Sequence, residues 1–377
     1  MPDTSLTPGA PILTCRGCGG DRLEQVLDLG RQSACDHFPP ADDPGPDPRW
    51  PLGLTMCRGC TLVQLDHVSP PEEEALAVES ATLRRHAEEV TTRILDRVEL
   101  PERPRVREFS SHHGGSWIEA WRTRGAAEVD TDADLVIDNQ SIIHSERMDS
   151  DLAERVTALG EHGALVIEFH HALRQVRGGQ FDTVRHGHPL YFSLHAWSAT
   201  CERHGLVIVD AWAEEVFGGC LLVVARRAGN GCEPSETVAE ILTAEKDAGI
   251  TDPAGYALLR DLARTVRTDV VGHLQAAKDT GRTIAAYGAG SKACTFLGAA
   301  DIGPDLLPYT ADLSPEKQGR RMPGVGVPIV SPDELVRRAP EEVLILTWDI
   351  ADEVVMQLRR AGSNARYVVP LPRLREA

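Results

Sequence analysis

The 377-residue sequence is poor in basic side chains and has no long apolar run. It has 39 Lys and Arg against 57 Asp and Glu, which gives a formal net charge of −18 at pH 7. Phosphate contacts supply most nucleic-acid affinity, so an acidic chain without a basic stripe predicts no nucleic-acid partner. No window approaches the roughly 18 apolar residues of a membrane helix, and the N-terminus lacks a signal peptide's charged and apolar regions. We therefore expect a cytoplasmic protein without a membrane partner.

The remaining composition is that of a globular protein. Hydrophobic residues make up 42% and charged residues 25% of the chain, which excludes wholesale disorder. At roughly 100–200 residues per domain, the length predicts two or three domains. A small basic pocket for one phosphorylated metabolite stays compatible with the acidic net charge.

Four of the nine cysteines stand in two Cys-x-x-Cys pairs, Cys15/Cys18 and Cys57/Cys60. A Gly beside each pair lets the backbone turn so that both thiolates can face one ion. Four thiolates form the closed tetrahedral set of a structural Zn²⁺, whereas redox pairs usually come singly and near a βαβ unit. We therefore predict structural zinc, with a redox pair as the alternative. The other five cysteines are predicted to be small apolar filling: Cys35, Cys201, Cys220, Cys232 and Cys294.

Apolar runs in the rest of the sequence alternate with helix-like segments in two blocks. A helix is predicted over 75–98, and residues 234–279 are predicted to be mostly helical. Two successive blocks of alternating strands and helices predict two doubly wound α/β domains. The predicted strands begin at Val106, Leu135, Leu165, Cys220, Thr283, Leu306, Val343 and Tyr367.

A glycine-rich turn follows the predicted strand at Thr283. It includes Gly288 and Lys292, and it opens a predicted helix whose free N–H groups and dipole can receive a phosphate. Alone this signal is weak, because such turns also occur for packing reasons. Polar segments that begin at Asp312 and Leu346 follow two further predicted strands, however. All three segments lie at carboxyl ends of strands, where open α/β sheets form ligand crevices.

Taken together, these segments resemble the zinc-containing sugar C-methyltransferases that act on TDP-linked keto-deoxysugars in bacterial antibiotic pathways. The resemblance covers nearly the whole chain and is densest in its C-terminal half. The matching motifs are the two cysteine pairs with D-L-G at Asp28–Gly30, Y-G-A-x-x-K at Tyr287–Lys292, D-x-x-P-x-K-Q-G at Asp312–Gly319, P-G at Pro323-Gly324, and L-x-W-x-x-x-x-E ending at Glu353.

The resemblance implies an α/β protein of three parts. They are a zinc-binding module (1–70), a methyltransferase-like Rossmann domain (71–230) and a C-terminal Rossmann-like domain (231–377) that holds the nucleotide diphosphate. The ligand is then a small nucleotide sugar. The residues expected to bind it are Tyr191, Tyr287, Gly288, Lys292, Asp312 and Lys317.

The central domain departs from that family where S-adenosylmethionine (SAM) binds. Family members have a Glu-x-Gly-x-x-Asp-Gly-like turn, but here the turn runs E-F-S-S-H-H-G from Glu108 to Gly114, with Ser110 and His113 at the Gly and Asp positions. Only 19 residues, 115–133, then precede the next predicted strand. A normal SAM fold places two further strands and their helices there, and one βαβ unit needs roughly 30 residues. The segment that would carry the acid for the cofactor's ribose is therefore expected to be missing, and SAM to be an unlikely cofactor.

The motif around the keto-sugar is retained in part. The segment that begins F-D-T-V at Phe181 matches the family's F-D-T-I-Y-H-E-H-x-x-Y-F-S-L. The resemblance gives His188 the role of the general base, and a histidine suits it because its ordinary pKa lies near neutral pH. Arg185 stands where the family has Tyr, and it can stabilise an enolate oxygen as a fixed cation. Arg185, His186 and His188 are thus the candidate catalytic residues; alternatively, His188 is an inherited structural residue.

Histidines are concentrated in this central part of the chain. Ten of the 14 lie between His112 and His204. We hypothesise that the vacated cofactor site is a histidine-lined acid/base or metal-binding pocket, although a chance cluster in a decayed site is an alternative. Adjacent histidines on an extended segment point in opposite directions, so at most one of each pair should contribute. The residues predicted to line this pocket are Glu108, His112, His113, His170 and His171.

The sequence thus predicts an enzyme that forms an enolate from a nucleotide-linked keto-sugar. Without a methyl donor, the enolate is reprotonated or loses a β-substituent, which gives epimerisation, tautomerisation or elimination. Two alternatives remain. One is a genuine SAM-dependent C-methyltransferase, and the other is a non-catalytic protein that binds a sugar nucleotide as the partner of a pathway enzyme.

Overall fold

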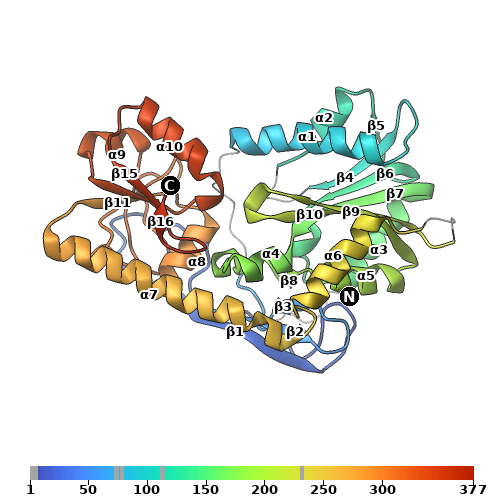
Figure 1. Cartoon of the computed structure of the whole chain (residues 1–377), viewed down its shortest axis with the longest axis horizontal. Coiled ribbons are helices and arrows are strands. Elements are labelled where there is room, and N and C mark those ends of the chain that lie inside the picture. Colours follow the sequence, from blue (N-terminus) through green and yellow to red (C-terminus); the bar gives the residue numbers. More distant parts are fainter. Residues whose placement is uncertain (1–6, 72–75, 77–79, 111–114, 230–232) are drawn as a thin grey trace.

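The strands of this protein form one four-stranded and two six-stranded sheets. The structure, a computed structural model, describes residues 7–71, 76, 80–110, 115–229 and 233–377. Figure 1 shows the two six-stranded units side by side, with the N-terminal strands below them. The predicted α/β class is confirmed. None of the described helices is both long and apolar enough to cross a membrane.

The N-terminal sheet carries both cysteine pairs. Its strands are β1 (Leu23–Gln32), β2 (Trp50–Cys57), β3 (Val63–Leu65) and β8 (Leu190–Tyr191). The strands pair antiparallel in that order. Cys15 and Cys18 precede β1, whereas Cys57 and Cys60 lie at the turn between β2 and β3. Because β8 comes from the central part of the chain, the sheet joins the module to that part through backbone hydrogen bonds.

The central sheet has six strands. They are β4 (Arg105–Ser110), β5 (Ala127–Glu128), β6 (Ala133–Asn139), β7 (Leu159–His170), β9 (Leu206–Glu214) and β10 (Cys220–Arg227). Their order is β5-β4-β6-β7-β10-β9, with the first four parallel and β10 antiparallel to both neighbours. The four strands predicted here are confirmed, whereas β5 and β9 were not foreseen.

Helices cover both faces of the central sheet. They are α1 (Ala81–Arg97), α2 (Ile118–Arg122), α3 (Met148–Ala158), α4 (Ala172–Arg177), α5 (Leu194–Arg203) and α6 (Glu236–Asp247). Ser80 caps α1, since its hydroxyl accepts a hydrogen bond from the Leu83 N–H at 3.2 Å. One apolar cluster joins α1, α2 and one face of the sheet, and another joins α3, α5, α6 and the opposite face. Figure 1 shows α1 and α2 above the sheet.

The short segment after β4 holds one helix and one strand. The segment that would carry the ribose acid was expected to be missing, but a strand is present there, because β5 pairs parallel with β4. The strand has only two residues, and its last one, Glu128, pairs with Val106 near the start of β4. At roughly 3.3 Å per residue, Glu128 lies about 13 Å short of the level where β4 ends at Ser110. The added strand thus stops well before the carboxyl edge of the sheet.

The C-terminal sheet also has six strands. They are β11 (Ile284–Tyr287), β12 (Thr310–Ala311), β13 (Ile329–Val330), β14 (Glu342–Ile345), β15 (Arg366–Val369) and β16 (Arg375–Glu376). Their order is β13-β12-β11-β14-β15-β16, and only β16 is antiparallel. The strand predicted from Leu306 is displaced to Thr310, because Leu306 and Leu307 donate to the Gly303 carbonyl in a turn.

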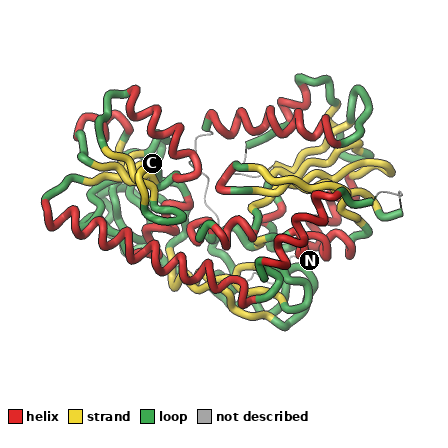
Figure 2. Tube along the Cα trace, viewed as in Figure 1, coloured by secondary structure: helices red, strands yellow, loops and turns green. Residues whose placement is uncertain are grey.

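Four helices accompany the C-terminal sheet. They are α7 (Ala257–Thr280), α8 (Ser291–Ala300), α9 (Pro332–Arg338) and α10 (Ala351–Arg360). Figure 2 shows α7 as one long helix that runs from the C-terminal unit toward the N-terminal strands. Arg260 of α7 donates to the Val26 carbonyl of β1 at 3.0 Å. One apolar cluster accordingly includes side chains of β1, β2, α4, α7 and α8.

A buried ion pair fastens the N-terminal module to the C-terminal unit. Arg321 binds both carboxylate oxygens of Asp47, at 2.6 and 2.8 Å, and the Gly324 N–H donates to the same carboxylate at 2.6 Å. Both charged side chains are at least nine-tenths buried. Such a bidentate pair fixes the relative orientation of the two side chains as well as the distance between them. The module therefore braces both α/β units.

A buried carboxylate, Glu245 of α6, fastens this helix to the central unit. It accepts from His171 Nε2 at 2.8 Å, from His195 Nδ1 at 2.7 Å and from the Leu194 N–H at 2.6 Å. Burial acts to raise the pKa of Glu245, but the hydrogen bonds from His171 and His195 outweigh burial and lower this pKa to about 2. The carboxylate is therefore charged in the folded protein at neutral pH.

Glu245→Gln should lower the free energy of unfolding by about 3 kcal/mol at pH 7, because the buried groups that donate to this carboxylate then lose their charged acceptor. The folded pKa lies below the ordinary value near 4.3, so this stabilisation is present above that pH and disappears as the pH falls toward 2. Denaturant titrations at pH 7 and pH 3 measure the difference, with exposed Glu240→Gln on the same helix as the control. An equal deficit at both pH values would contradict the assignment.

Candidate functional site

The four cysteines of the two pairs come together in the N-terminal module. Their Sγ atoms all lie within 4.8 Å of one another, with Cys15–Cys60 at 3.5 Å and Cys18–Cys57 at 3.6 Å. A tetrahedral zinc with Zn–S bonds near 2.3 Å needs sulfurs about 3.8 Å apart, so the set fits this ion. The Gly17 N–H donates to Cys15 Sγ at 3.3 Å, as a thiolate requires. All four positions are filled by protein, which indicates a structural metal.

The cysteine cluster also anchors the module to its neighbours. Arg16, between the first two cysteines, binds Glu146 at 2.8 Å and donates to the Leu65 carbonyl at 2.8 Å. Arg203 of α5 donates to the Gly17 carbonyl at 2.8 Å. Loss of the metal would therefore loosen contacts with the central unit as well as within the module.

Cys18→Ser should reduce bound zinc from one atom per chain to nearly none, because three thiolates hold the ion far more weakly than four. Metal content measured by mass spectrometry on purified protein tests this. Cys201→Ala is the control, since Cys201 is buried in α5 and lies outside the cluster. Two metals per wild-type chain, or one retained in the variant, would contradict a single four-cysteine site.

A second cluster, which we call the histidine pocket, consists of His144, His170, Arg185 and His188. Both Nε and Nη2 of Arg185 approach His188 Nε2, at 3.1 and 2.6 Å. The His188 ring lies 4.6 Å from that of His144 and 5.8 Å from that of His170. The residues come from the segment before β8, from the end of β7 and from a 3₁₀ turn, η1 (Ile142–His144). The pocket thus unites two predicted catalytic residues with one predicted pocket residue.

The histidine pocket is electrostatically positive. Burial, followed by the charges of Lys292 and Arg185, lowers the pKa of His170 to about 3, so this ring is neutral. The Asp36 carboxylate lies 3.8 Å from Arg185, and Cys35 Sγ lies 3.5 Å from it. Burial raises the pKa of Cys35 to about 12, which keeps that thiol uncharged. A site with these charges suits an oxyanion and opposes a metal cation; among the described residues, the four-cysteine set alone could hold a metal.

Three other predicted site residues support the protein framework. His171 points away from His170 and binds Glu245, as adjacent residues on a strand do. His186 Nε2 lies 3.1 Å from the Pro51 carbonyl, outside the pocket. The Tyr191 hydroxyl accepts from the Arg185 N–H at 3.2 Å, and burial raises the pKa of Tyr191. Tyr191 therefore orders the backbone that carries Arg185.

The glycine-rich turn after β11 is held by hydrogen bonds to other residues of the protein. Gly288 has φ +107°, and a Cβ there would lie 2.8 Å from Thr347 Cγ2, so the position requires glycine. Asp312 accepts from the Ala289 N–H at 2.7 Å, and Lys317 Nζ donates to the Ala289 carbonyl at 2.9 Å. Lys317 is only 5% exposed. Asp312 and Lys317 therefore hold the turn in place, whereas both were expected to contact the nucleotide.

Lys292, at the start of α8, connects this turn with the histidine pocket. Its Nζ binds Asp349 at 2.8 Å, donates to the Phe217 carbonyl at 3.0 Å and lies 4.7 Å from the centre of the Trp348 ring. Trp348 and Asp349 belong to a 3₁₀ turn, η5 (Trp348–Ile350). Trp348 Nε1 in turn donates to buried Asp182 at 2.7 Å. The Tyr287 hydroxyl faces Gln357 at 3.4 Å, on another side of β11.

Burial raises the pKa of Asp182 to about 6, despite the opposing charge of Lys292. Asp182 lies in the F-D-T motif and Trp348 in the L-x-W motif of the sequence, but neither residue was predicted to have a role at the site. Because the two lie 166 positions apart in the chain, only the fold shows that they meet. A buried carboxylate with a raised pKa beside a lysine is typical of functional sites.

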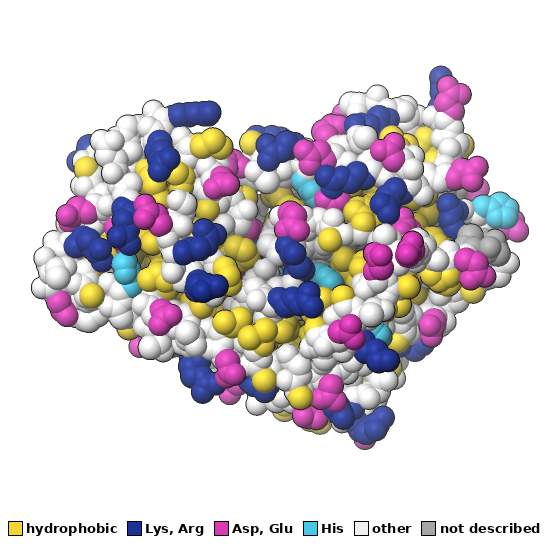
Figure 3. All heavy atoms as spheres, in the orientation of Figure 1, with side chains coloured by type: hydrophobic (Ala, Val, Ile, Leu, Met, Phe, Trp, Pro, Cys, Tyr) yellow, Lys and Arg dark blue, Asp and Glu magenta, His cyan; other side chains and the backbone are white. Residues whose placement is uncertain are grey.

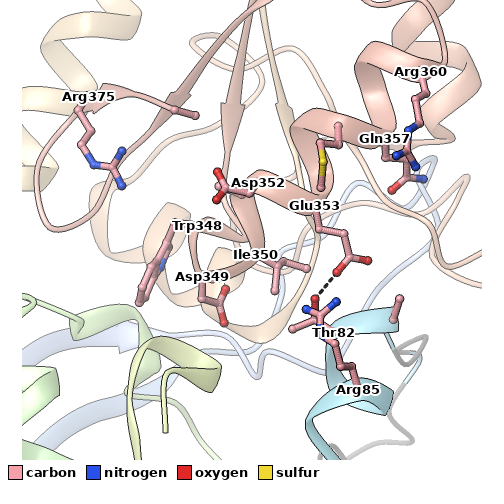
Figure 4. A pocket seen from close by; sticks show the side chains of 14 residues that line it. Thr82, Arg85, Trp348, Asp349, Ile350, Asp352, Glu353, Gln357, Arg360 and Arg375 are labelled. Carbon is pink, nitrogen blue, oxygen red and sulfur yellow. Dashed lines mark hydrogen bonds between the residues drawn. The ribbon is translucent and has the colours of Figure 1, made fainter. Parts of the chain in front are cut away.

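A cavity of about 760 Å³, which we call the interdomain cleft, lies between α1 and the C-terminal unit. Figure 4 shows Thr82 and Arg85 of α1 facing Glu353 of α10, with Trp348 farther along the wall. Thr82 donates a hydrogen bond to Glu353 across the cleft. Arg360 and Arg375 also line it, and Figure 3 shows the molecule hollowed between its two lobes. Trp348 lines the cleft and contacts Lys292, which binds the carbonyl of Phe217; the Phe217 ring lies 5.7 Å from that of His170.

Two acids near the expected cofactor site are bound to protein groups. Glu108 accepts from the Ser116 hydroxyl and from the Trp117 N–H, so it caps the start of α2, and burial raises its pKa. Glu128 is bound by Arg122 at 2.6 Å near the opposite end of the sheet. His112 and His113 lie outside the described residues.

A buried hydrogen-bonded chain closes the carboxyl ends of β6 and β7. Glu168 accepts from Gln140 Nε2 at 2.9 Å and from His86 Nε2 at 2.6 Å. Burial opposes protonation of His86, but the hydrogen bond and charge of Glu168 raise its pKa. This chain ties α1 to the sheet at the edge where a ligand crevice is expected.

Comparison with known proteins gives matches over most of the chain. A C-methyltransferase C-terminal domain matches residues 215–372, and a putative zinc binding domain matches residues 15–74. The curated protein C-methyltransferase NovU of Streptomyces niveus is 27% identical over 96% of each chain. These matches support both the zinc-binding and the C-methyltransferase-like expectations.

Solved methyltransferases resemble about two-fifths of the chain, and only distantly. A Burkholderia thailandensis 1,6-didemethyltoxoflavin-N1-methyltransferase is 15% identical, covers 40% of this chain and 80% of its own, and gives a TM-score of 0.30. The second is a complex of the Haloferax volcanii Trm112 methyltransferase activator and a methyltransferase. It is 11% identical, covers 39% of this chain and 92% of its own, and gives a TM-score of 0.32. These likenesses carry no argument about cofactor or substrate.

Proposed function

We propose that the chain, which resembles the zinc-containing TDP-sugar C-methyltransferases, binds a nucleotide-linked keto-sugar and moves a proton beside the ketone without methyl transfer. The observation that carries this proposal is the buried histidine pocket, in which Arg185 and Lys292 set a positive potential around neutral His170. Such a pocket stabilises the negative charge that develops on a ketone oxygen when a neighbouring C–H bond is broken.

The interdomain cleft is the proposed site of the nucleotide diphosphate. Its volume of about 760 Å³ lies within the usual range for small-molecule sites, roughly 300–1,000 Å³. Arg85, Arg360 and Arg375 line it, and an arginine can bind a phosphate through two parallel hydrogen bonds. A sugar attached to a diphosphate in this cleft would extend past Trp348 toward Lys292. The expected contacts of Asp312 and Lys317 with the ligand are replaced in this proposal by the arginines.

Arg360→Glu should weaken TDP binding about tenfold or more, since one charge-assisted hydrogen bond contributes roughly 1.5–3 kcal/mol. Isothermal titration calorimetry with TDP measures the change. Arg359→Glu is the matched control, because Arg359 is also exposed on α10 but lies over the Tyr367 ring, 5.6 Å from its centre, and does not line the cleft. Equal losses in the two variants would place the diphosphate elsewhere.

The proposed reaction starts with the acidic proton on the carbon next to the ketone. A histidine of the pocket takes this proton, the C–H electron pair becomes the new C=C bond, and the carbonyl pair moves to oxygen. Arg185 stabilises the resulting enolate as a permanent cation. The family resemblance favours His188 as the base. Without a methyl donor, the enolate is reprotonated or expels a β-substituent, giving epimerisation, tautomerisation or elimination.

Two residues near the expected cofactor site support a reaction without methyl transfer. Ser110 ends β4 where the family turn has its first glycine, and the acid of β5, Glu128, lies at the wrong end of the sheet. Ser110 and Glu128 thus depart from the glycine and the acid that the family uses to bind SAM, whereas the rest of the turn lies outside the described residues. The competing function, genuine SAM-dependent C-methylation, is favoured by the family resemblance. Micromolar binding of S-adenosylhomocysteine in calorimetry would support that competitor.

A TDP-linked 4-keto-deoxysugar incubated with the enzyme in deuterated water should take up deuterium beside the ketone. His188→Ala should abolish the uptake, because it removes a histidine of the pocket and the partner that positions Arg185. Mass spectrometry of the sugar measures incorporation, and unchanged TDP affinity shows that the variant still folds. Absence of uptake and of any product from the wild-type enzyme would remove the proton-transfer proposal and leave a binding protein.

A further inference from the structure

The histidines of the pocket differ in which ring nitrogen is available. Two N–H groups of Arg185 converge on His188 Nε2, at 3.1 and 2.6 Å. A guanidinium has only donors and keeps its charge at every ordinary pH. His188 Nε2 must therefore be the accepting, unprotonated nitrogen. The neutral His188 ring then carries its proton on Nδ1, which makes it a hydrogen-bond donor toward other groups.

Arg185 is held in this position from several sides. Its guanidinium lies 3.5 Å from Cys35 Sγ and 3.8 Å from Asp36. Its backbone N–H donates to the Tyr191 hydroxyl at 3.2 Å. The side chain is 4% exposed, so its charge cannot swing into water. Release of His188 Nε2 would therefore require the protein to rearrange a buried ion, which is costly.

In His170 the hydrogen-bonding contact is made by Nδ1, whereas in His188 it is made by Nε2. It is 8% exposed, and its one hydrogen-bonding contact with a described residue is that of Nδ1 with Cys220 Sγ at 4.0 Å. Within the part of the chain that the structure describes, Nε2 of His170 thus has no hydrogen-bond partner. The ring lies 5.8 Å from that of His188 and 5.7 Å from that of Phe217. A neutral imidazole with an unengaged nitrogen beside the pocket can accept a proton directly.

We propose that His170 is the base and that Arg185 fixes His188 as the donor that holds the ketone oxygen. The assignment rests on the proposed keto-sugar chemistry. The proton leaves carbon for His170 Nε2, the C–H pair forms the C=C bond, and the carbonyl pair settles on the oxygen that His188 Nδ1–H binds. No proton leaves His188, and the return of the proton from His170 to carbon restores the enzyme.

The charge of the substrate makes His170 a stronger base in the complex. The pKa of free His170 is lowered first by burial and then by Lys292, Arg185 and His144. The diphosphate bound by the cleft arginines adds negative charge on the Lys292 side of the pocket, and the developing enolate adds it beside Arg185. Opposite charge nearby favours the protonated ring. Binding of the anionic substrate therefore activates the base that will act on it.

Glutamine variants separate the two roles. In His188→Gln the amide retains an N–H donor, so deuterium uptake should stay within about tenfold of the wild type. In His170→Gln the imidazole that accepts the proton is lost, so uptake should fall about 10²–10⁴-fold. His162→Gln, an exposed histidine on the same strand, is the control and should be unchanged. A large loss in His188→Gln with little change in His170→Gln would overturn the assignment.

A second measurement does not depend on turnover. In ¹⁵N-histidine-labelled enzyme, the His188 Nδ1 should carry the proton and Nε2 should not, and Arg185→Met should remove this preference. Protonation of Nε2 in the wild type would overturn the assignment even if the keto-sugar reaction is confirmed. If the wild-type enzyme shows no deuterium uptake, the proposed function fails and the assignment fails with it. Zinc content and TDP affinity of each variant confirm that it is folded.

Discussion

The charge of Arg185 is the constraint on which the rest of the site depends. A buried guanidinium must be surrounded by acceptors, and here they come from different parts of the chain: Asp36 and Cys35 follow β1, whereas His188 lies in the central unit. The position of β1 depends in turn on the four-cysteine cluster at its base and on the buried Asp47–Arg321 pair. The zinc module therefore helps to position Arg185 and His188, the candidate catalytic residues, although it lies outside the histidine pocket.

How far the sequence predicts this structure depends on the range of each interaction. The cysteine cluster was predictable, because two Cys-x-x-Cys pairs carry their geometry in short spacings, and the strands at Val106, Leu135 and Leu165 are long apolar runs. The strand at Leu306 was misplaced, since a local turn overrides its apolar residues. Lys317 was assigned to a ligand, but it is buried against a backbone carbonyl. A charged residue in a motif does not reveal whether it supports a turn or faces solvent.

The candidate site was predictable only in outline for the same reason. The motif placed Arg185 and His188 near each other, and the opposite directions of His170 and His171 follow from strand geometry. The contact of Asp182 with Trp348, and the cleft between α1 and α10, arise from packing of distant segments. Likewise, the short segment 115–133 predicted a reduced central sheet, but only the register of β5 shows that Glu128 stops short of the carboxyl edge. Register is set by tertiary pairing and not by composition.

Lys292 gives the two units a common electrostatic element. It starts a helix of the C-terminal unit, yet it binds the carbonyl of Phe217, a residue of the central unit with φ +55°. A left-handed conformation at a non-glycine residue costs roughly 1–2 kcal/mol and persists only when its surroundings require it. The same Phe217 ring lies against His170. In the proposed reaction, negative charge brought toward Lys292 would act on His170 in two ways, through the field at His170 and through the loop that packs on it. Coupling of this kind allows the nucleotide half of a substrate to promote chemistry on its sugar.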